Sequence, residues 1–251
     1  MAIDVKTLRI DKSQIPSQLY SLTLEIPTYS MYRSARRRYP QQERMPYSVE
    51  ELLLAIAMKE VDDKPFDSQP RDLVDRLEPF PIRDRQFLTI AMTDLLFLSK
   101  EQAQSAKEIA ENLSKQYQPR YRIPKGSMPN PNLTIEFNTP STGVQFQADK
   151  KYNGMAETGC SLEEFLLSYC LATVNDVEVE KPKDVISILD SWDIADVQFA
   201  ATVFINMFTI GDTDMDDAKK LAGDLRQQLS SGPKDLTEAT TPVQSRKATV
   251  S

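Results

Sequence analysis

The stretch SVEELLL at residues 48–54 returns as SLEEFLL at residues 161–167, which lies 113 positions further along the chain. After one deletion the matches continue at an offset of 112, and the pairs are Pro70/Pro182, Asp72/Asp184, Leu77/Leu189, Ile82/Ile194, Asp84/Asp196, Gln86/Gln198, Phe87/Phe199, Ala106/Ala218, Lys107/Lys219, Ala110/Ala222 and Leu113/Leu225. Average residue usage gives chance identities at about one position in sixteen. So many matches in order predict that one unit occurs twice in tandem.

Both units begin with an extended arm. LTLEI at residues 22–26 and LTIEF at residues 133–137 alternate apolar and polar residues, which is the pattern of a half-buried strand. Each arm is therefore predicted to contribute at least one strand.

Four helices are predicted to follow each arm. The first begins at a capping box, formed by Ser48 with Glu51 and by Ser161 with Glu164. In this motif the serine hydroxyl accepts the backbone N–H of the glutamate, and the glutamate carboxylate accepts the backbone N–H of the serine. A short second helix follows a proline in each unit. The third is the core helix, with apolar residues at helical spacing at Ile82, Phe87, Leu88, Ala91, Leu95 and Leu96, and at Ile194, Phe199, Ala200, Val203, Met207 and Phe208. The fourth runs from Glu101 to Leu113 and from Asp214 to Leu229.

The predicted fold class is α+β, predominantly α-helical, built as a tandem duplication of a strand arm plus a helical bundle. The boundaries are residues 1–113 for the first unit, 114–131 for a proline-rich linker, 132–229 for the second unit and 230–251 for a polar flexible tail. The sequence favours a pseudo-twofold pair of units but leaves open that they lie as separate bodies on the linker.

Composition excludes much chemistry. The chain of 251 residues contains no histidine, so Ser-His-Asp and Cys-His nucleophiles and nearly all zinc catalysis are excluded. Its two cysteines, Cys160 and Cys170, do not form a close Cys-x-x-Cys pair and are interpreted as small hydrophobic residues. With seven glycines it has no phosphate-binding glycine loop. We therefore expect no enzymatic activity, no metal and no cofactor.

Charge and hydropathy bear on partners and location. A net charge of −7 argues against a general nucleic-acid binder, whose affinity comes from a basic face. The longest apolar stretch, residues 199–210, is interrupted by polar residues and is predicted to be a buried helix rather than a membrane span. The first six residues carry no secretion signal, so we expect synthesis in the cytoplasm of a cell or of an infected cell.

The most basic and aromatic stretch is the candidate binding site. Arginine and tyrosine are enriched at protein interfaces, and the same residues can grip a phosphate backbone or form a solvated face. The protein-contact interpretation leads. The candidate partner-binding residues are Tyr29, Tyr32, Arg33, Arg36, Arg37, Arg38 and Tyr39 in the first unit, and Lys150, Lys151 and Tyr152 in the second.

Two acidic patterns receive structural interpretations. Asp212, Asp214 and Asp216 imitate the start of a calcium loop, but Asp217 stands where glycine is needed, so capping of the last helix is favoured. Asp84 and Asp196 near the start of the core helices are likewise interpreted as capping residues. Trp192 is predicted to pack across the first turn of the following helix.

The strings LEPFPIRDRQFL at residues 77–88 and LDSWDIADVQF at residues 189–199 carry a family resemblance. They resemble the small baseplate hub and baseplate assembly proteins of T-even-type contractile-tailed phages. The resemblance implies a non-enzymatic virion protein of the tail baseplate, which is made in the host cytoplasm and acts through protein–protein contacts. It transfers no functional residue.

Three functional hypotheses follow. The first is a structural protein of a phage baseplate whose partners are other tail proteins, without direct nucleic-acid or membrane binding, within a symmetric hetero-oligomer. The second is a transient tail-assembly chaperone or adaptor that is absent from the mature virion. The third is a nucleic-acid-associated packaging protein, for which DNA binding would be salt-sensitive.

Overall fold

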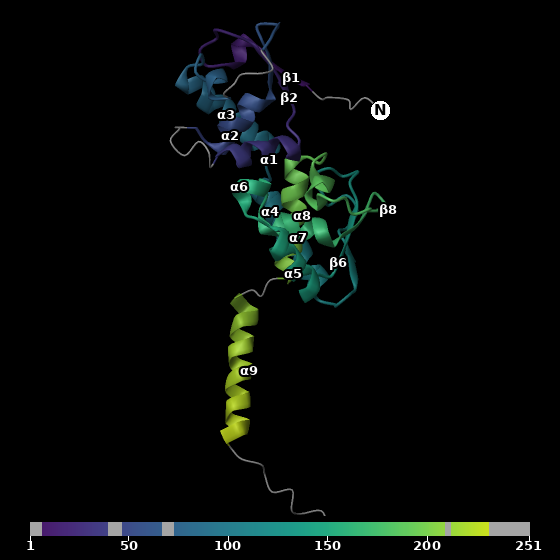
Figure 1. Ribbon diagram of the computed structural model, residues 1–251. Coiled ribbons are helices and arrows are strands. Elements are labelled where there is room, and N and C mark those ends of the chain that lie inside the picture. The colour runs from purple at the N-terminus through teal and green to yellow at the C-terminus, as the bar shows by residue number, and fades with distance from the viewer. Residues whose placement is uncertain (1–6, 40–46, 67–72, 209–211, 231–251) are drawn as a thin grey trace, which may run out of the picture. The chain divides into compact units, whose positions relative to one another are not determined.

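The computed structural model describes residues 7–39, 47–66, 73–208 and 212–230 (Figure 1). The chain divides into a body, residues 1–208, and a C-terminal part, residues 209–251, and each is described by itself. The fold is mixed α and β, with 55% helix and two small antiparallel sheets, which confirms a predominantly helical α and β fold. Among the described helices, none is long and apolar enough to cross a bilayer.

Each sheet has four strands that pair in chain order. The first sheet consists of β1 (Thr7–Ile10), β2 (Leu22–Glu25), β3 (Met58–Val61) and β4 (Lys64–Pro65). The second consists of β5 (Arg120–Arg122), β6 (Ile135–Asn138), β7 (Leu171–Val174) and β8 (Val177–Glu178).

The two sheets share their irregularities. The register of β2 against β3 shifts between Thr23 and Leu24, and that of β6 against β7 shifts between Glu136 and Phe137. The hairpins that follow turn on two residues with positive φ, Asp62 and Asp63 in the first and Asn175 and Asp176 in the second. Aspartate and asparagine tolerate this left-handed conformation, which a two-residue hairpin of the primed type requires.

A side chain in each turn also holds the preceding strand. An Oδ1 atom of Asp62 accepts a hydrogen bond from the Ser21 N–H at 3.0 Å, and Asn175 Oδ1 accepts one from the Thr134 N–H at 2.9 Å. These bonds fix the start of β2 and of β6 to the hairpin of the same sheet.

The two halves of the body contain the following helical elements. The N-terminal half contains η1 (Lys12–Gln14), α1 (Tyr29–Arg38), α2 (Val49–Ala57), η3 (Val74–Arg76), α3 (Ile82–Leu96) and α4 (Lys100–Ser114). The C-terminal half contains α5 (Thr142–Lys151), α6 (Met155–Thr158), α7 (Leu162–Cys170), η4 (Val185–Leu189) and α8 (Ile194–Phe208). The C-terminal part of the chain contains α9 (Asp212–Ser230).

Local signals explain where these helices begin. Both predicted capping boxes are confirmed at the starts of α2 and α7. The hydroxyls of Ser48 and Ser161 each accept the N3 N–H, and the N3 glutamate carboxylate accepts the serine N–H. The predicted second helices are 3-10 turns instead. The two segments have three and five residues, and such short runs favour the tighter i to i+3 hydrogen bond.

The stretch predicted to be a linker, residues 114–131, contains strand β5 and part of a core. Tyr121, Ile123 and Met128 in this stretch are buried. Alternating apolar residues at 121 and 123 are a strand signal, but flanking arginines and prolines obscured it.

Helix α4 packs against α8 rather than against α3, the helix that it follows (Figure 1). Its alanines Ala106 and Ala110 are fully buried in the second core, which allows the two helices to approach closely. Tyr29 of α1 also lies in the second core, and in the opposite direction Ile194 of α8 lies in the first. The two halves of the body therefore exchange core residues.

Asp84 and Asp196, predicted to cap their helices, instead bind the loop between the first two strands of a sheet, β1 and β2 or β5 and β6. Asp84 accepts hydrogen bonds from the Ser17 N–H at 3.1 Å and the Tyr20 hydroxyl at 3.0 Å. Asp196 accepts the Asn130 N–H at 2.8 Å. The residue preceding α3 is a proline, which gives no side-chain cap. The Asp84 carboxylate accepts a loop N–H, where the prediction expected it to accept an N–H of the helix itself.

Candidate functional site

Helix α1 carries most of the predicted binding residues, and half of them point inward. Tyr29 and Arg33 are buried in the body itself. The Nε atom of Arg33 donates to the Thr158 carbonyl oxygen at 3.1 Å, and its Nη1 atom donates to Asp190 at 2.6 Å. Spacing of four residues puts Tyr29 and Arg33 on one face of the helix, and that face lies against the C-terminal half.

Arg36 extends this contact with an ion pair. Its Nη1 atom lies 2.9 Å from Glu164 of α7, and both side chains are largely buried. Glu164 also accepts the Ser161 N–H of its capping box at 2.6 Å. The Arg36 guanidinium lies 5.1 Å from the centre of the Tyr32 ring, and Tyr32 in turn packs edge-on against Phe97.

The backbone completes the seam between the halves. The Tyr29 N–H donates to the Trp192 carbonyl oxygen at 2.9 Å, and Thr28 forms an isolated antiparallel bridge with Asp193. Trp192 itself is buried in the second core. Tyr29, Tyr32, Arg33 and Arg36 thus join the two halves, and the burial of Tyr29 raises the pKa of its hydroxyl.

Other predicted residues converge on one open hollow, which we call the basic hollow. It measures about 640 Å³ and is lined by Arg33 and Arg37 of α1, Lys150 and Lys151 of α5, Asn153, Glu157, Thr158, Phe165, Tyr169, Lys183, Asp184, Val185 and Ile186. Its lining therefore carries five basic and two acidic side chains over an apolar base of phenylalanine, valine and isoleucine.

Several of these cations are unpaired. Within the described residues, Arg37, Lys150 and Lys183 have no carboxylate partner within 4.0 Å. The Lys151 ammonium lies 5.6 Å from the centre of the Tyr169 ring. Arg33 is occupied by Asp190, so the free positive charge comes from the lysines and Arg37. An anionic group would fit this arrangement, because unpaired surface cations attract it at little desolvation cost.

Sequence reasoning missed Lys183. The signal that could have found it is a basic residue between proline and aspartate in both units, Arg71 in the first and Lys183 in the second. Arg38 and Tyr39 are exposed at the end of α1 but do not line the basic hollow. Tyr152 donates its hydroxyl to the Cys160 carbonyl oxygen at 3.2 Å, which is a contact within the fold.

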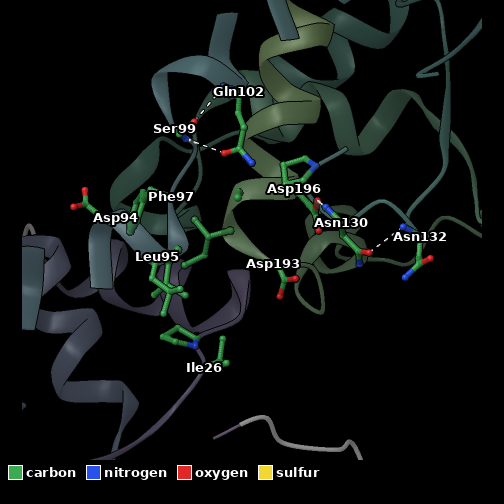
Figure 2. A pocket seen from close by; sticks show the side chains of 15 residues that line it. Ile26, Asp94, Leu95, Phe97, Ser99, Gln102, Asn130, Asn132, Asp193 and Asp196 are labelled. Carbon is green, nitrogen blue, oxygen red and sulfur yellow. Dashed lines mark hydrogen bonds between the residues drawn. The ribbon is translucent and has the colours of Figure 1, made fainter. Parts of the chain in front are cut away.

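A larger hollow of about 800 Å³ lies where the ends of α3, α4 and α8 meet (Figure 2). Figure 2 shows Ser99 bonded to Gln102, and Asn130 bonded to Asp196 and Asn132. These polar groups thus form hydrogen bonds within the fold, at the start of α4 and in the loop that contains Asn130. Burial raises the pKa of Asp196, and the Asn130 N–H opposes that shift.

Metal chemistry has little support in the described part of the chain. No cluster of three or more histidine, cysteine, aspartate or glutamate side chains that could hold an ion occurs there. The side chains of Asp212 and Asp214 from the calcium-like pattern lie outside the described residues, whereas Asp216 forms an ion pair with Lys219 at 3.1 Å. Cys160 and Cys170 are both buried and unpaired, as predicted.

Comparisons with protein-family models, with curated proteins and with solved structures give no match for this chain. The geometry of the basic hollow is therefore the observation from which function is inferred.

Proposed function

We propose that this protein is a non-enzymatic structural protein that acts through protein–protein contacts, and that the basic hollow binds an acidic segment of a partner protein. The observation that carries the proposal is the convergence of Arg37, Lys150, Lys151 and Lys183 on one hollow with an apolar base. An acidic peptide can pair its carboxylates with the rim while an apolar side chain covers the base.

Two features favour a peptide over nucleic acid. A nucleic acid carries a charge at every phosphate and would place some of them beside the carboxylates of Glu157 and Asp184, whereas a peptide can place uncharged residues there. The chain as a whole also carries a net charge of −7. Nucleic-acid sites are normally basic throughout.

The resemblance of residues 77–88 to baseplate proteins supplies the proposed setting. The partner is then another structural protein of a phage tail, and the chain is part of the virion. A transient assembly chaperone that leaves before the virion matures is the alternative, and proteomics of purified particles distinguishes the two.

We further propose that the two halves arose by tandem duplication. The shared strand order, the matching register shifts and the paired positive-φ turns support this proposal. So do two ion pairs that lie 113 positions apart, Arg9 with Asp63 and Arg122 with Asp176. A unit used twice can present similar surfaces to a symmetric partner.

The binding proposal is tested with a fluorescently labelled peptide of glutamate and leucine residues and with a DNA duplex, each titrated by anisotropy. The charge-reversed variant Lys150→Glu/Lys151→Glu is compared with Lys115→Glu/Lys125→Glu, which changes the same charge at exposed lysines away from the hollow. We expect the first variant to weaken peptide binding at least tenfold and the second to change it by less than about twofold. Peptide binding that is equal in both variants contradicts the site. DNA binding that is stronger than peptide binding contradicts the protein partner and favours the packaging alternative.

A further inference from the structure

Helix α3 exposes an apolar face, defined by Phe87, Ile90, Ala91 and Leu95 and called here the α3 face. The exposed fractions of Phe87, Ile90 and Leu95 are 45%, 62% and 59%. Exposed phenylalanine, isoleucine and leucine that gather on one helix face are a signature of an interaction surface.

The equivalent face in the C-terminal half is covered. Phe199 of α8, 112 positions after Phe87, is only 1% exposed, and Val203, 112 positions after Ala91, is fully buried. The cover is α4, which packs along α8. The Leu98 N–H before α4 donates to Gln198 of α8 at 2.9 Å, whereas the equivalent Gln86 on α3 is exposed.

Helix α9 carries the same stripe as α4. The apolar positions of α4 are Ala103, Ala106, Ile109, Ala110 and Leu113, and those of α9, 112 positions later, are Met215, Ala218, Leu221, Ala222 and Leu225. On α4 this stripe is buried or half-buried against the second core. On α9 all five residues are exposed.

Leu8 of β1 is a further exposed residue whose equivalent in the C-terminal half, Tyr121, is buried. Tyr121 of β5 is 4% exposed, because its hydroxyl bonds the chain just after α4 at the Gln116 carbonyl oxygen and the Gln118 N–H. The equivalent residue of β1, Leu8, is 37% exposed. The chain after α4 thus contacts a residue of the second sheet whose equivalent in the first sheet is exposed.

We propose that α9 of one copy of this chain packs on the α3 face of a second copy, in the way that α4 packs on α8. The segments that connect α3 to α4 and α8 to α9 indicate which helix α9 covers. Three residues separate α3 from α4, and α4 does not return to α3 but reaches the helix of the following half. Three residues also separate α8 from α9, so by the same geometry we expect α9 to reach the α3 face of another copy rather than return to α8.

The interface is heterologous, because the α3 face of one copy meets α9 of the next. Such a contact repeats from copy to copy until a ring closes or a filament grows. The proposal does not rest on the basic hollow, whose lining shares no residue with the α3 face or α9.

Light scattering coupled to size-exclusion chromatography tests the proposal with two single variants. Ile90→Glu places a charge on the α3 face and Leu221→Glu places one on the α9 stripe. Both side chains are exposed, so neither change disturbs a core, and circular dichroism checks the fold. We expect the wild-type chain to be at least a dimer, and each variant alone to have the 28.5 kDa mass of a single chain.

The mixture of the two variants is decisive. Each retains one intact half of the interface, so the mixture should form a species of twice the single-chain mass and stop there. The control Lys220→Glu introduces the residue that α4 carries at its equivalent exposed position, Glu108, and should assemble like the wild type. A monomeric wild type, including one in which α9 binds α3 of its own chain, overturns the proposal. So does a mixture that remains monomeric, or a dimer that persists with Ile90→Glu alone.

Discussion

Only glycine fits at position 159 without a shift of the surrounding backbone. Its φ is +69°, which is left-handed, and an added Cβ would overlap the backbone oxygen of Arg33 on the opposite side of the seam. We expect Gly159→Ala to lower the free energy of unfolding by at least about 2 kcal/mol, because strain and overlap add. Urea denaturation measures this cost.

The matched control is Gly126→Ala. Its φ of +81° is equally left-handed, but no atom lies within 4 Å of the added Cβ. It should therefore cost only the strain, about 1 kcal/mol. Equal costs at the two positions would show that the close approach of Arg33 does not constrain the seam.

Asp196 should make stability depend on pH in a defined direction. Burial raises its pKa above the ordinary 3.8 of the unfolded chain. Between these two values the folded state binds more protons than the unfolded state, so stability falls as the pH rises through that window. At neutral pH the wild type therefore retains the cost of a buried charge.

Asp196→Asn keeps an oxygen that can accept the Asn130 N–H but removes the charge. We expect this variant to be more stable than the wild type at neutral pH, and the difference to shrink as the pH falls to 3.8. Urea denaturation of both proteins across this range measures the difference, and titration of the other acids affects both alike. A difference that does not change with pH would contradict the raised pKa.

At the scale of elements, the sequence predicted where helices begin better than it predicted which helices pack together. Capping boxes and apolar periodicity are local, so Ser48 and Ser161 identified α2 and α7, and the long apolar faces identified α3 and α8. Strand β5 was missed because three residues, two of them arginine, give a weak periodic signal. The pairing of α4 with α8 was not predictable, since periodicity shows that a face is apolar but not which helix covers it.

The same limit applies to the candidate site. Tyr29, Arg33 and Arg36 were predicted from their chemistry to bind a partner protein, whereas in the fold they contact the other half of the chain. Their spacing alone could not distinguish an internal seam from an external partner. Lys183 reaches the basic hollow from the segment before η4, a proximity that only the tertiary fold creates.

At the scale of the whole molecule, the exchange of residues between the two cores has a consequence for unfolding. Ala106 and Ala110 belong by sequence to the first half but lie in the second core, and Ile194 does the reverse. Neither core can be completed without the other half. We therefore expect residues 7–208 to unfold as one cooperative unit rather than as two domains.

The single tryptophan makes this expectation measurable, because Trp192 lies in the second core, at its seam with the N-terminal half. Leu52→Ala removes a fully buried side chain from the first core and should cost about 2 to 5 kcal/mol. If the body is cooperative, this distant change lowers the urea midpoint of Trp192 fluorescence as much as that of far-ultraviolet circular dichroism. The exposed change Lys125→Ala should leave both midpoints in place. If Leu52→Ala shifts the dichroism but leaves the fluorescence midpoint unmoved, the halves unfold independently, and the exchanged residues do not couple the two cores.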